Sequence, residues 1–236
     1  ATLVSSHGQA LLSDALLATL AQAVRASRAE RLDGEIAADL SCATEDDRAL
    51  EADIRASLAG ASIDIIVQPV ATRRKALFLA DMDSTMIGQE CIDELAAYVG
   101  LKDLVAGITE RAMRGEIAFE PALRERVALL KGVKLSVVEE IIRERITLTP
   151  GGKALLATMR SNGAYTALVS GGFTVFTGPL GATIGFDEHR SNTLLAEGGV
   201  LTGEVAEPIL GKQAKLDALV ELRARFGVPP KQTLAI

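Results

Sequence analysis

The sequence lacks tryptophan and contains only two tyrosines and six phenylalanines among its 236 residues. It has only two cysteines, Cys42 and Cys91, and no CxxC pair. This scarcity excludes a disulfide scaffold and is typical of reduced thiols in a cytoplasmic protein. No apolar stretch approaches the ~18 residues of a spanning helix, and residues 1–10 lack the pattern of a signal peptide. We therefore expect a cytoplasmic protein without a membrane partner.

The sequence also lacks an excess of positive charge. Lysine and arginine number 25 against 31 aspartates and glutamates, a net charge of −6, which argues against a nucleic-acid partner. The two histidines, His7 and His189, are far apart in the sequence, and we expect neither to be functional. Hydrophobic residues make up 48% of the chain, enough for a core built from Ala, Leu, Val and Ile.

The N-terminal third has the pattern of a small α+β module. Short strands are expected at 1–5, 35–42 and 63–67, with helices at 15–26 and 46–58. This order suggests a ferredoxin-like fold similar to ACT-type regulatory modules. We place this module at residues 1–72 and a second domain at 73–236.

The second domain has the pattern of an α/β protein with a doubly wound parallel sheet. Residues 76–80 and 165–169 are apolar runs typical of strands buried on both faces, and 233–236 begins as a strand. Helices are expected at 90–99, 153–160, from 173 and at 212–226, with a mostly helical stretch up to 146 and a hairpin at 194–203.

Two carboxylates, Asp81 and Asp83, directly follow the first buried strand, at the sheet edge where ligands bind in open α/β sheets. Close carboxylates repel unless a cation or proton lies between them, which suggests Mg²⁺. One could attack a phosphorus atom while the other moves the proton. By itself, a DxD tripeptide is more often a pair of solvated acids in a loop. Here its position directly after a buried strand favours a ligand-binding site.

Ser170-Gly171-Gly172 follows the second buried strand and opens a helix, so its hydroxyl and amides could bind an anion. An ordinary turn is the alternative. Lys215 lies on the helix expected at 212–226 and would matter only beside a phosphate, since most exposed helix lysines are simply solvated.

Together these residues resemble the haloacid dehalogenase superfamily, and within it the phosphoserine phosphatase family. The segments DMDSTMIGQECIDELA (81–96), TERAMRGEIAFEPALRERVALLKG (109–132), LVSGGF (168–173) and LTGEV (201–205) carry the resemblance. It implies a Rossmann-like core with a helical cap, at about 88–150, inserted after the first strand. The N-terminal module is similar only loosely, as the ACT-like extension that such enzymes often carry.

The resemblance also implies roles for individual residues. Asp81 would be the nucleophile, and Asp83 the general acid and then base, with Asp81 and the Asp83 backbone carbonyl holding Mg²⁺. The phosphoryl group would be bound by Ser170, Gly171, Gly172 and Lys215. Glu90 would bind an ammonium and Arg126 a carboxylate, and Met113 and Phe119 would line the pocket. Glu90 as a first-turn helix acid, Arg126 as a surface residue, and Met113 and Phe119 as plain core are the alternatives.

The expected reaction is hydrolysis of O-phospho-L-serine through an aspartyl phosphate, the last step of serine biosynthesis. A phosphatase or phosphotransferase for another small amine-bearing phosphomonoester, or an inactive ligand sensor, stays open, as does a homodimer. The family's fourth motif, GDGxxD, would follow a strand such as 233–236. For a chain that ends at Ile236 we expect an incomplete metal site, weak Mg²⁺ binding and little activity.

Overall fold

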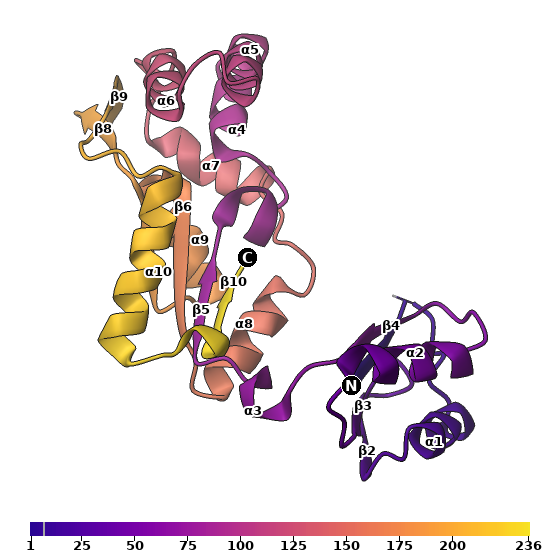
Figure 1. Ribbon diagram of the computed structural model, residues 1–236. Helices are drawn as coiled ribbons and strands as arrows, with labels where there is room; N and C mark the ends of the chain where they lie inside the picture. The colour runs from indigo at the N-terminus through magenta and orange to yellow at the C-terminus, as the bar shows by residue number, and fades with distance from the viewer. Residues whose placement is uncertain (7) are drawn as a thin grey trace. The chain divides into compact units, whose positions relative to one another are not determined.

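The computed structural model describes residues 1–6 and 8–236, so His7 lies outside the described residues. The chain divides into two compact units, Ala1–Arg73 and Arg74–Ile236 (Figure 1). The expected boundary lay between residues 72 and 73. Within the described ranges, no helix has the length and apolar character needed to cross a membrane.

The N-terminal unit is an antiparallel sheet covered by two helices. Its elements are β1 (Thr2–Ser5), α1 (Asp14–Ala23), β2 (Arg28–Asp33), β3 (Ala37–Ser41), α2 (Asp47–Ser57), β4 (Ile63–Ile66) and the short α3 (Val70–Arg73). The strand order is β2-β3-β1-β4, and every pair is antiparallel. Leu3, Leu20, Leu40 and Ile54 form part of its buried core. The β-α-β-β-α-β order is that of ferredoxin-like folds.

The expectation for this unit omitted β2, which the structure adds as an edge strand. Its sequence, RAERLD, is exposed at five of six positions and has no alternation of apolar and polar residues. Both helices were expected, and each begins at a side-chain cap: the Ser13 hydroxyl accepts from the Leu16 amide, and Asp46 accepts from the Arg48 and Ala49 amides. Caps leave a local signal in the sequence, whereas a solvated edge strand does not.

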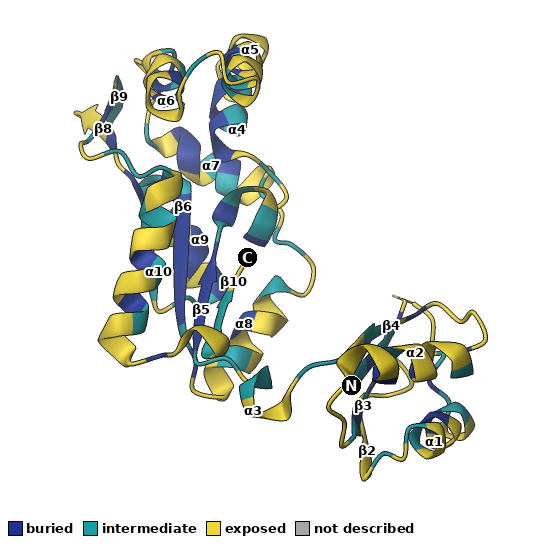
Figure 2. Ribbon diagram, viewed as in Figure 1, coloured by how far each residue is buried: buried dark blue, intermediate teal, exposed yellow. Residues whose placement is uncertain are grey.

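The C-terminal unit is built on a parallel sheet of order β10-β5-β6-β7. Its strands are β5 (Leu77–Ala80), β6 (Tyr165–Phe173), β7 (Glu188–Asn192) and β10 (Thr233–Ala235), and its helices are α8 (Gly152–Ser161), α9 (Thr174–Ile184) and α10 (Lys212–Phe226). Figure 2 shows that β5 and β6 are buried along most of their length. Strand β7 was not expected, because its sequence EHRSN is polar.

Successive residues of β5 face opposite sides of the sheet and meet different helices. Leu77 and Leu79 belong to the cluster that contains Ala218 and Leu222 of α10. Phe78 and Ala80 belong to the larger cluster with residues of α8 and α9. Burial on both faces explains why the strand is a continuous apolar run, and it confirms the doubly wound α/β class.

A helical lobe, which we call the cap, lies at the end of the core where β5 ends (Figure 1). It contains α4 (Cys91–Tyr98), α5 (Lys102–Met113), α6 (Phe119–Ala128) and α7 (Ser136–Glu144). A bridge between Ile87 and Leu148 joins the two segments that lead into and out of it. Beside this bridge, the Gln89 side-chain carbonyl accepts from the Thr147 amide at 2.9 Å.

The expected hairpin consists of β8 (Leu194–Glu197) and β9 (Val200–Val205), joined by Gly198 and Gly199 with positive φ angles of 58° and 78°. The hairpin packs against α6 rather than standing apart. The Leu201 amide donates to the Val133 carbonyl at 2.8 Å, and the Gly132 amide donates to the Leu201 carbonyl at 2.9 Å. The lobe over the sheet edge therefore combines helices with a hairpin from much later in the chain.

Candidate active site

Asp81 directly follows β5 and is the N-cap residue of an irregular turn, η1 (Met82–Met86), which contains Asp83. The Asp81 carboxylate accepts a hydrogen bond from the Met82 amide at 2.8 Å. Ser84 has φ 53°, the left-handed conformation, which lets the chain fold back so that its amide donates to the Gln89 carbonyl. The turn thus holds both carboxylates at the carboxyl end of the sheet and leads into the cap.

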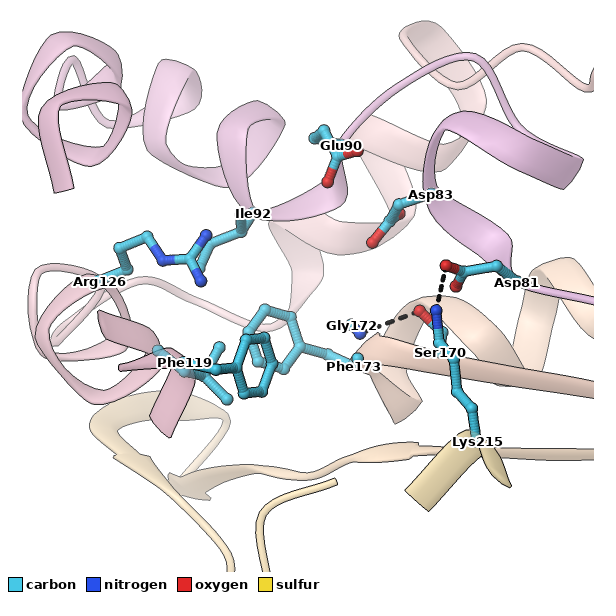
Figure 3. A pocket seen from close by; sticks show the side chains of 12 residues that line it. Asp81, Asp83, Glu90, Ile92, Phe119, Arg126, Ser170, Gly172, Phe173 and Lys215 are labelled. Carbon is cyan, nitrogen blue, oxygen red and sulfur yellow. Dashed lines mark hydrogen bonds and ion pairs between the residues drawn. The ribbon is translucent and has the colours of Figure 1, made fainter. Parts of the chain in front are cut away.

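A cavity of about 210 Å³ lies between this sheet edge and the cap (Figure 3). Its lining residues are Asp81, Asp83, Glu90, Ile92, Phe119, Leu123, Arg126, Ser170, Gly171, Gly172, Phe173 and Lys215. All the site residues expected from the sequence are among them except Met113. The structure therefore brings together side chains from the segment that follows β5, from β6, from α10 and from the cap.

Met113 does not line this cavity, and its side chain is 85% exposed. It is the last residue of α5, whose buried positions are Val105 and Ile108. At about 100° per residue, Met113 lies about 140° around the helix from Ile108. It therefore falls outside the buried face of α5, and the placement of Met113 at the pocket was wrong.

The end of the cavity next to the sheet combines anionic and cationic groups. Lys215 Nζ forms an ion pair with Asp81 Oδ2 (Figure 3). The Ser170 side chain, 2% exposed, accepts from the Gly172 amide at 2.9 Å. A Cβ at Gly172 would lie 2.9 Å from Asp83 Oδ2 and 3.1 Å from Ser170 Oγ, so only glycine fits there without displacing them. Hydroxyl, amides and ammonium together form a site suited to a phosphoryl group.

Asp83 is the carboxyl group most perturbed by its surroundings. Burial, with smaller contributions from the charges of Glu90 and Asp81, raises its pKa to about 6, and hydrogen bonding with Cys91 opposes this shift. The Cys91 amide donates to Asp83 Oδ1 at 3.3 Å. A carboxyl group with a pKa near 6 can both give and take a proton close to neutral pH.

The end of the cavity next to the cap carries two opposite charges. Glu90 is the N-cap residue of α4, and its carboxylate accepts from the Ser84 hydroxyl at 2.7 Å. Arg126 of α6 donates from Nε to the Ala122 carbonyl and from Nη1 to the Thr109 hydroxyl, each at 3.2 Å. Burial lowers the pKa of Arg126, while the charges of Asp93 and Glu90 raise it. A guanidinium stays protonated throughout the physiological range.

The wall between the two ends is apolar, formed by Ile92, Phe119, Leu123 and Phe173. Built at Gly171 and Gly211, a Cβ would lie 3.4 Å and 3.2 Å from the Phe119 ring, so both glycines leave room for it. Sequence reasoning missed Ile92, Leu123 and Phe173, because apolar residues at helical or strand spacing are usually core. Their position inside the family-like segments was the one available signal.

Buried Asn192, at the end of β7, was also missed. Its Nδ2 donates to the carbonyls of Gly171 at 2.8 Å and Leu210 at 3.1 Å, and its Oδ1 accepts from the Leu210 amide at 2.7 Å. It thereby ties Gly171, near the end of β6, to the loop that leads into α10 and Lys215. Only the fold brings these segments together, so no local pattern in the sequence could have shown this role.

Oxygen donors for a divalent cation are present, but few. Asp81 and Asp83 are the carboxylates at the sheet end, and hard cations such as Mg²⁺ prefer such oxygens. Among residues 1–6 and 8–236, no group of three or more His, Cys, Asp or Glu side chains could hold a metal ion. Two carboxylates suit a divalent cation chemically, but they are too few to fill its coordination shell. Further oxygen ligands, such as those of water or a phosphate, would have to complete it.

Comparison with known proteins identifies the family of the C-terminal unit. Residues 78–236 match the sequence model of the haloacid dehalogenase-like hydrolase family. The chain belongs to this family. The match includes every residue that lines the cavity.

Relatives within the family include phosphoserine phosphatases. That of Albidiferax ferrireducens is 45% identical over 165 residues, covering 68% of this chain and 70% of the relative. That of Archaeoglobus fulgidus is 43% identical over 176 residues, covering 74% of this chain and 51% of the relative, so the chain spans about half of that protein's length. A solved structure described as a phospho-aspartyl intermediate analogue of phosphoserine phosphatase is 36% identical, with a TM-score of 0.63, covering 69% of this chain and 78% of that one.

Proposed function

We propose that the protein hydrolyses O-phospho-L-serine to L-serine and phosphate. The observation that carries this proposal is the pairing of one phosphate-binding end with two opposite charges, Glu90 and Arg126, in one small cavity. Phosphoserine carries a phosphate, an ammonium and a carboxylate. Glu90 suits the ammonium, and the planar guanidinium of Arg126 suits the carboxylate. The likeness to phosphoserine phosphatases of two organisms supports the same substrate.

The first chemical step uses the two aspartates. An oxygen of Asp81 attacks the phosphorus in line, the bond from phosphorus to the serine oxygen breaks, and protonated Asp83 gives its proton to that oxygen. This forms an aspartyl phosphate, and the solved structure of a phospho-aspartyl intermediate analogue in a related phosphatase supports such a species. A pKa of about 6 for Asp83 leaves a fraction of it protonated near neutral pH.

The second step reverses the proton's direction. Asp83, now a carboxylate, takes a proton from a water molecule while the oxygen of that water attacks the phosphorus. The bond between phosphorus and the Asp81 oxygen breaks, which releases phosphate and restores the Asp81 carboxylate. Lys215, the Ser170 hydroxyl and the Gly171 amide stabilise the charge on the phosphoryl oxygens. The Gly172 amide joins them by exchanging its bond to Ser170 Oγ for one to a phosphoryl oxygen. Because Lys215 is paired with Asp81 in this structure, a phosphate would compete for that ammonium.

Mg²⁺ is the cation we propose, held by the Asp81 carboxylate and the Asp83 backbone carbonyl. When bound, it would offset negative charge at the phosphoryl group. The cap would close over the cavity and limit the entry of water. The N-terminal unit would be an ACT-like module, an inference supported by its β-α-β-β-α-β order.

Three phosphomonoesters test the substrate on the full natural protein with Mg²⁺. O-phosphoserine carries both groups, phosphoethanolamine lacks the carboxylate, and 3-phosphoglycerate has a hydroxyl in place of the ammonium. We expect kcat/KM for phosphoserine to exceed that for each analogue by roughly a hundredfold or more, because unpaired charges in the site penalise the analogues. Equal turnover of phosphoethanolamine would favour a broader amine-phosphate phosphatase. Binding of phosphoserine without release of phosphate would identify an inactive sensor.

A further inference from the structure

Thr109 lies outside the residues that line the cavity, yet it contacts one of them directly. It belongs to α5, and its Oγ1 is 3.2 Å from Nη1 of Arg126 on α6. The two helices pack against each other within the cap. Thr109 is therefore the one side chain outside Arg126's own helix with a hydrogen bond to its guanidinium, among the residues the structure describes.

The direction of this hydrogen bond is fixed by a second one. The Thr109 hydroxyl donates its only hydrogen to the Val105 carbonyl, one helical turn earlier, at 3.0 Å. Its oxygen is then left with lone pairs, and a guanidinium can only donate. The intrahelical bond thus presets Thr109 as an acceptor for Arg126.

The remaining contacts show what this acceptor achieves. Nε of Arg126 donates to the Ala122 carbonyl at 3.2 Å, so two of the five guanidinium N–H groups are held by the cap itself. Arg126 takes part in no ion pair within 4.0 Å inside the described ranges. The three remaining N–H groups are available to an anion in the cavity that Arg126 lines.

We propose that Thr109 is a positioning residue that orients the Arg126 guanidinium toward a substrate carboxylate. The proposal rests on the proposed function, because it assigns Arg126 to the carboxylate of phosphoserine. A planar guanidinium binds a carboxylate through two parallel bonds only when its plane is correctly turned. Two contacts, one along α6 and one from α5, restrict that rotation. Thr109 therefore acts on substrate selection and not on the phosphoryl chemistry.

The test compares Thr109→Val, which keeps the shape but removes the acceptor, with Thr109→Ser, which keeps the hydroxyl. For Thr109→Val we expect KM for phosphoserine to rise roughly tenfold with kcat nearly unchanged, the range for a lost hydrogen bond to a charged group. KM for phosphoethanolamine, which has no carboxylate, should change less than about twofold. Thr109→Ser should restore most of the affinity for phosphoserine.

Thr158→Val is the matched control. Thr158 lies on α8 and donates to the Ala154 carbonyl at 2.8 Å, the same intrahelical bond. Within the described part of the chain, it forms no hydrogen bond with a residue that lines the cavity. Its KM for both substrates should equal that of the unmodified protein. In an Arg126→Ala background, Thr109→Val should have no further effect on KM, because its target is gone.

Two results would overturn the proposal while leaving the proposed function intact. One is an equal rise in KM for phosphoserine and phosphoethanolamine in Thr109→Val. The other is an additive effect of Thr109→Val in the Arg126→Ala background. Failure of the unmodified protein to hydrolyse phosphoserine would instead reject the proposed function itself.

Discussion

The two ends of the cavity differ in how the chain builds them. The end to which we assign catalysis, the catalytic end, contains Asp81, Asp83, Ser170 and Lys215. It lies at the ends of two buried parallel strands and on α10, a helix that packs against them. The end to which we assign substrate recognition, the recognition end, contains Glu90 and Arg126. It lies on cap helices whose mutual packing sets its geometry. The first end is held by a sheet, which has little freedom to shift. The second depends on side chains such as Thr109 that act from behind the cavity.

The ends also differ in their electrostatics. At the catalytic end, Asp81 is already neutralised by Lys215, and Asp83 has a raised pKa because of its burial. At the recognition end, Glu90 is bonded to a neutral hydroxyl and Arg126 to a hydroxyl and a carbonyl. The catalytic end satisfies its charges internally, while the recognition end has charges to offer to a ligand. Substitutions at the catalytic end should therefore lower the turnover of every substrate. Substitutions at the recognition end should weaken only those substrates that carry the matching charge.

The largest expected effect comes from Asp81→Asn at the catalytic end. An amide oxygen is a far poorer nucleophile than a carboxylate, so we expect kcat to fall at least roughly a thousandfold for phosphoserine and for both analogues. Phosphate release by the purified variant measures this. The variant should remain folded, since Asn can still accept from the Met82 amide. Undiminished turnover would remove Asp81 from the mechanism.

Glu90→Gln should have a smaller and more selective effect at the recognition end. The neutral amide keeps the size of the side chain but loses the charge that faces an ammonium. We expect KM for phosphoserine and phosphoethanolamine to rise roughly tenfold, with kcat within about threefold of the original. KM for 3-phosphoglycerate, which has no ammonium, should stay the same or fall. A uniform loss on all three substrates would mean that Glu90 serves the catalytic end, and the comparison would fail.

This contrast explains how much of the site the sequence could predict. Asp81, Asp83 and Ser170 follow continuous apolar runs, and a buried parallel strand leaves that local signal in any sequence. Arg126 and Phe119 have no such signal, because an arginine or phenylalanine on a helix is equally compatible with surface or core. They were reached only through the family resemblance. The same resemblance misplaced Met113, whose position depends on how α5 is rotated.

The secondary-structure elements also divide into those with a local sequence signal and those without one. Strand β5 and the helices with clear caps or apolar faces were expected close to their observed bounds. Strand β6 was expected to end at residue 169, but it continues to Phe173, so Ser170, Gly171 and Gly172 lie within the strand and not after it. The polar strands β2 and β7 were missed, since long-range pairing rather than composition makes them strands. The packing of the β8–β9 hairpin on α6 joins residues about 70 positions apart, and no short-range pattern encodes such a contact.

The smallest expected effect is a pH dependence of the protein's stability that arises from Asp83. Because its pKa is raised to about 6 from an ordinary 3.8, the folded state binds more protons than the unfolded state between these values. Stability therefore falls as pH rises through this window, by about 1 kcal/mol between pH 5 and pH 8. Urea unfolding followed by circular dichroism, with EDTA present, measures this contribution as the difference between the unmodified protein and Asp83→Asn.

In Glu90→Gln, measured against the double variant that also carries Asp83→Asn, the contribution should shrink without vanishing. The charge of Glu90 is one cause of the raised pKa of Asp83, but a lesser one than burial. A contribution unaffected by Glu90→Gln would show that the two ends are electrostatically independent. One that vanished in Glu90→Gln would show instead that the recognition end controls the pKa of the catalytic acid. In that case, binding an ammonium at Glu90 would itself lower the pKa of Asp83, so the substrate would change the catalyst that acts on it.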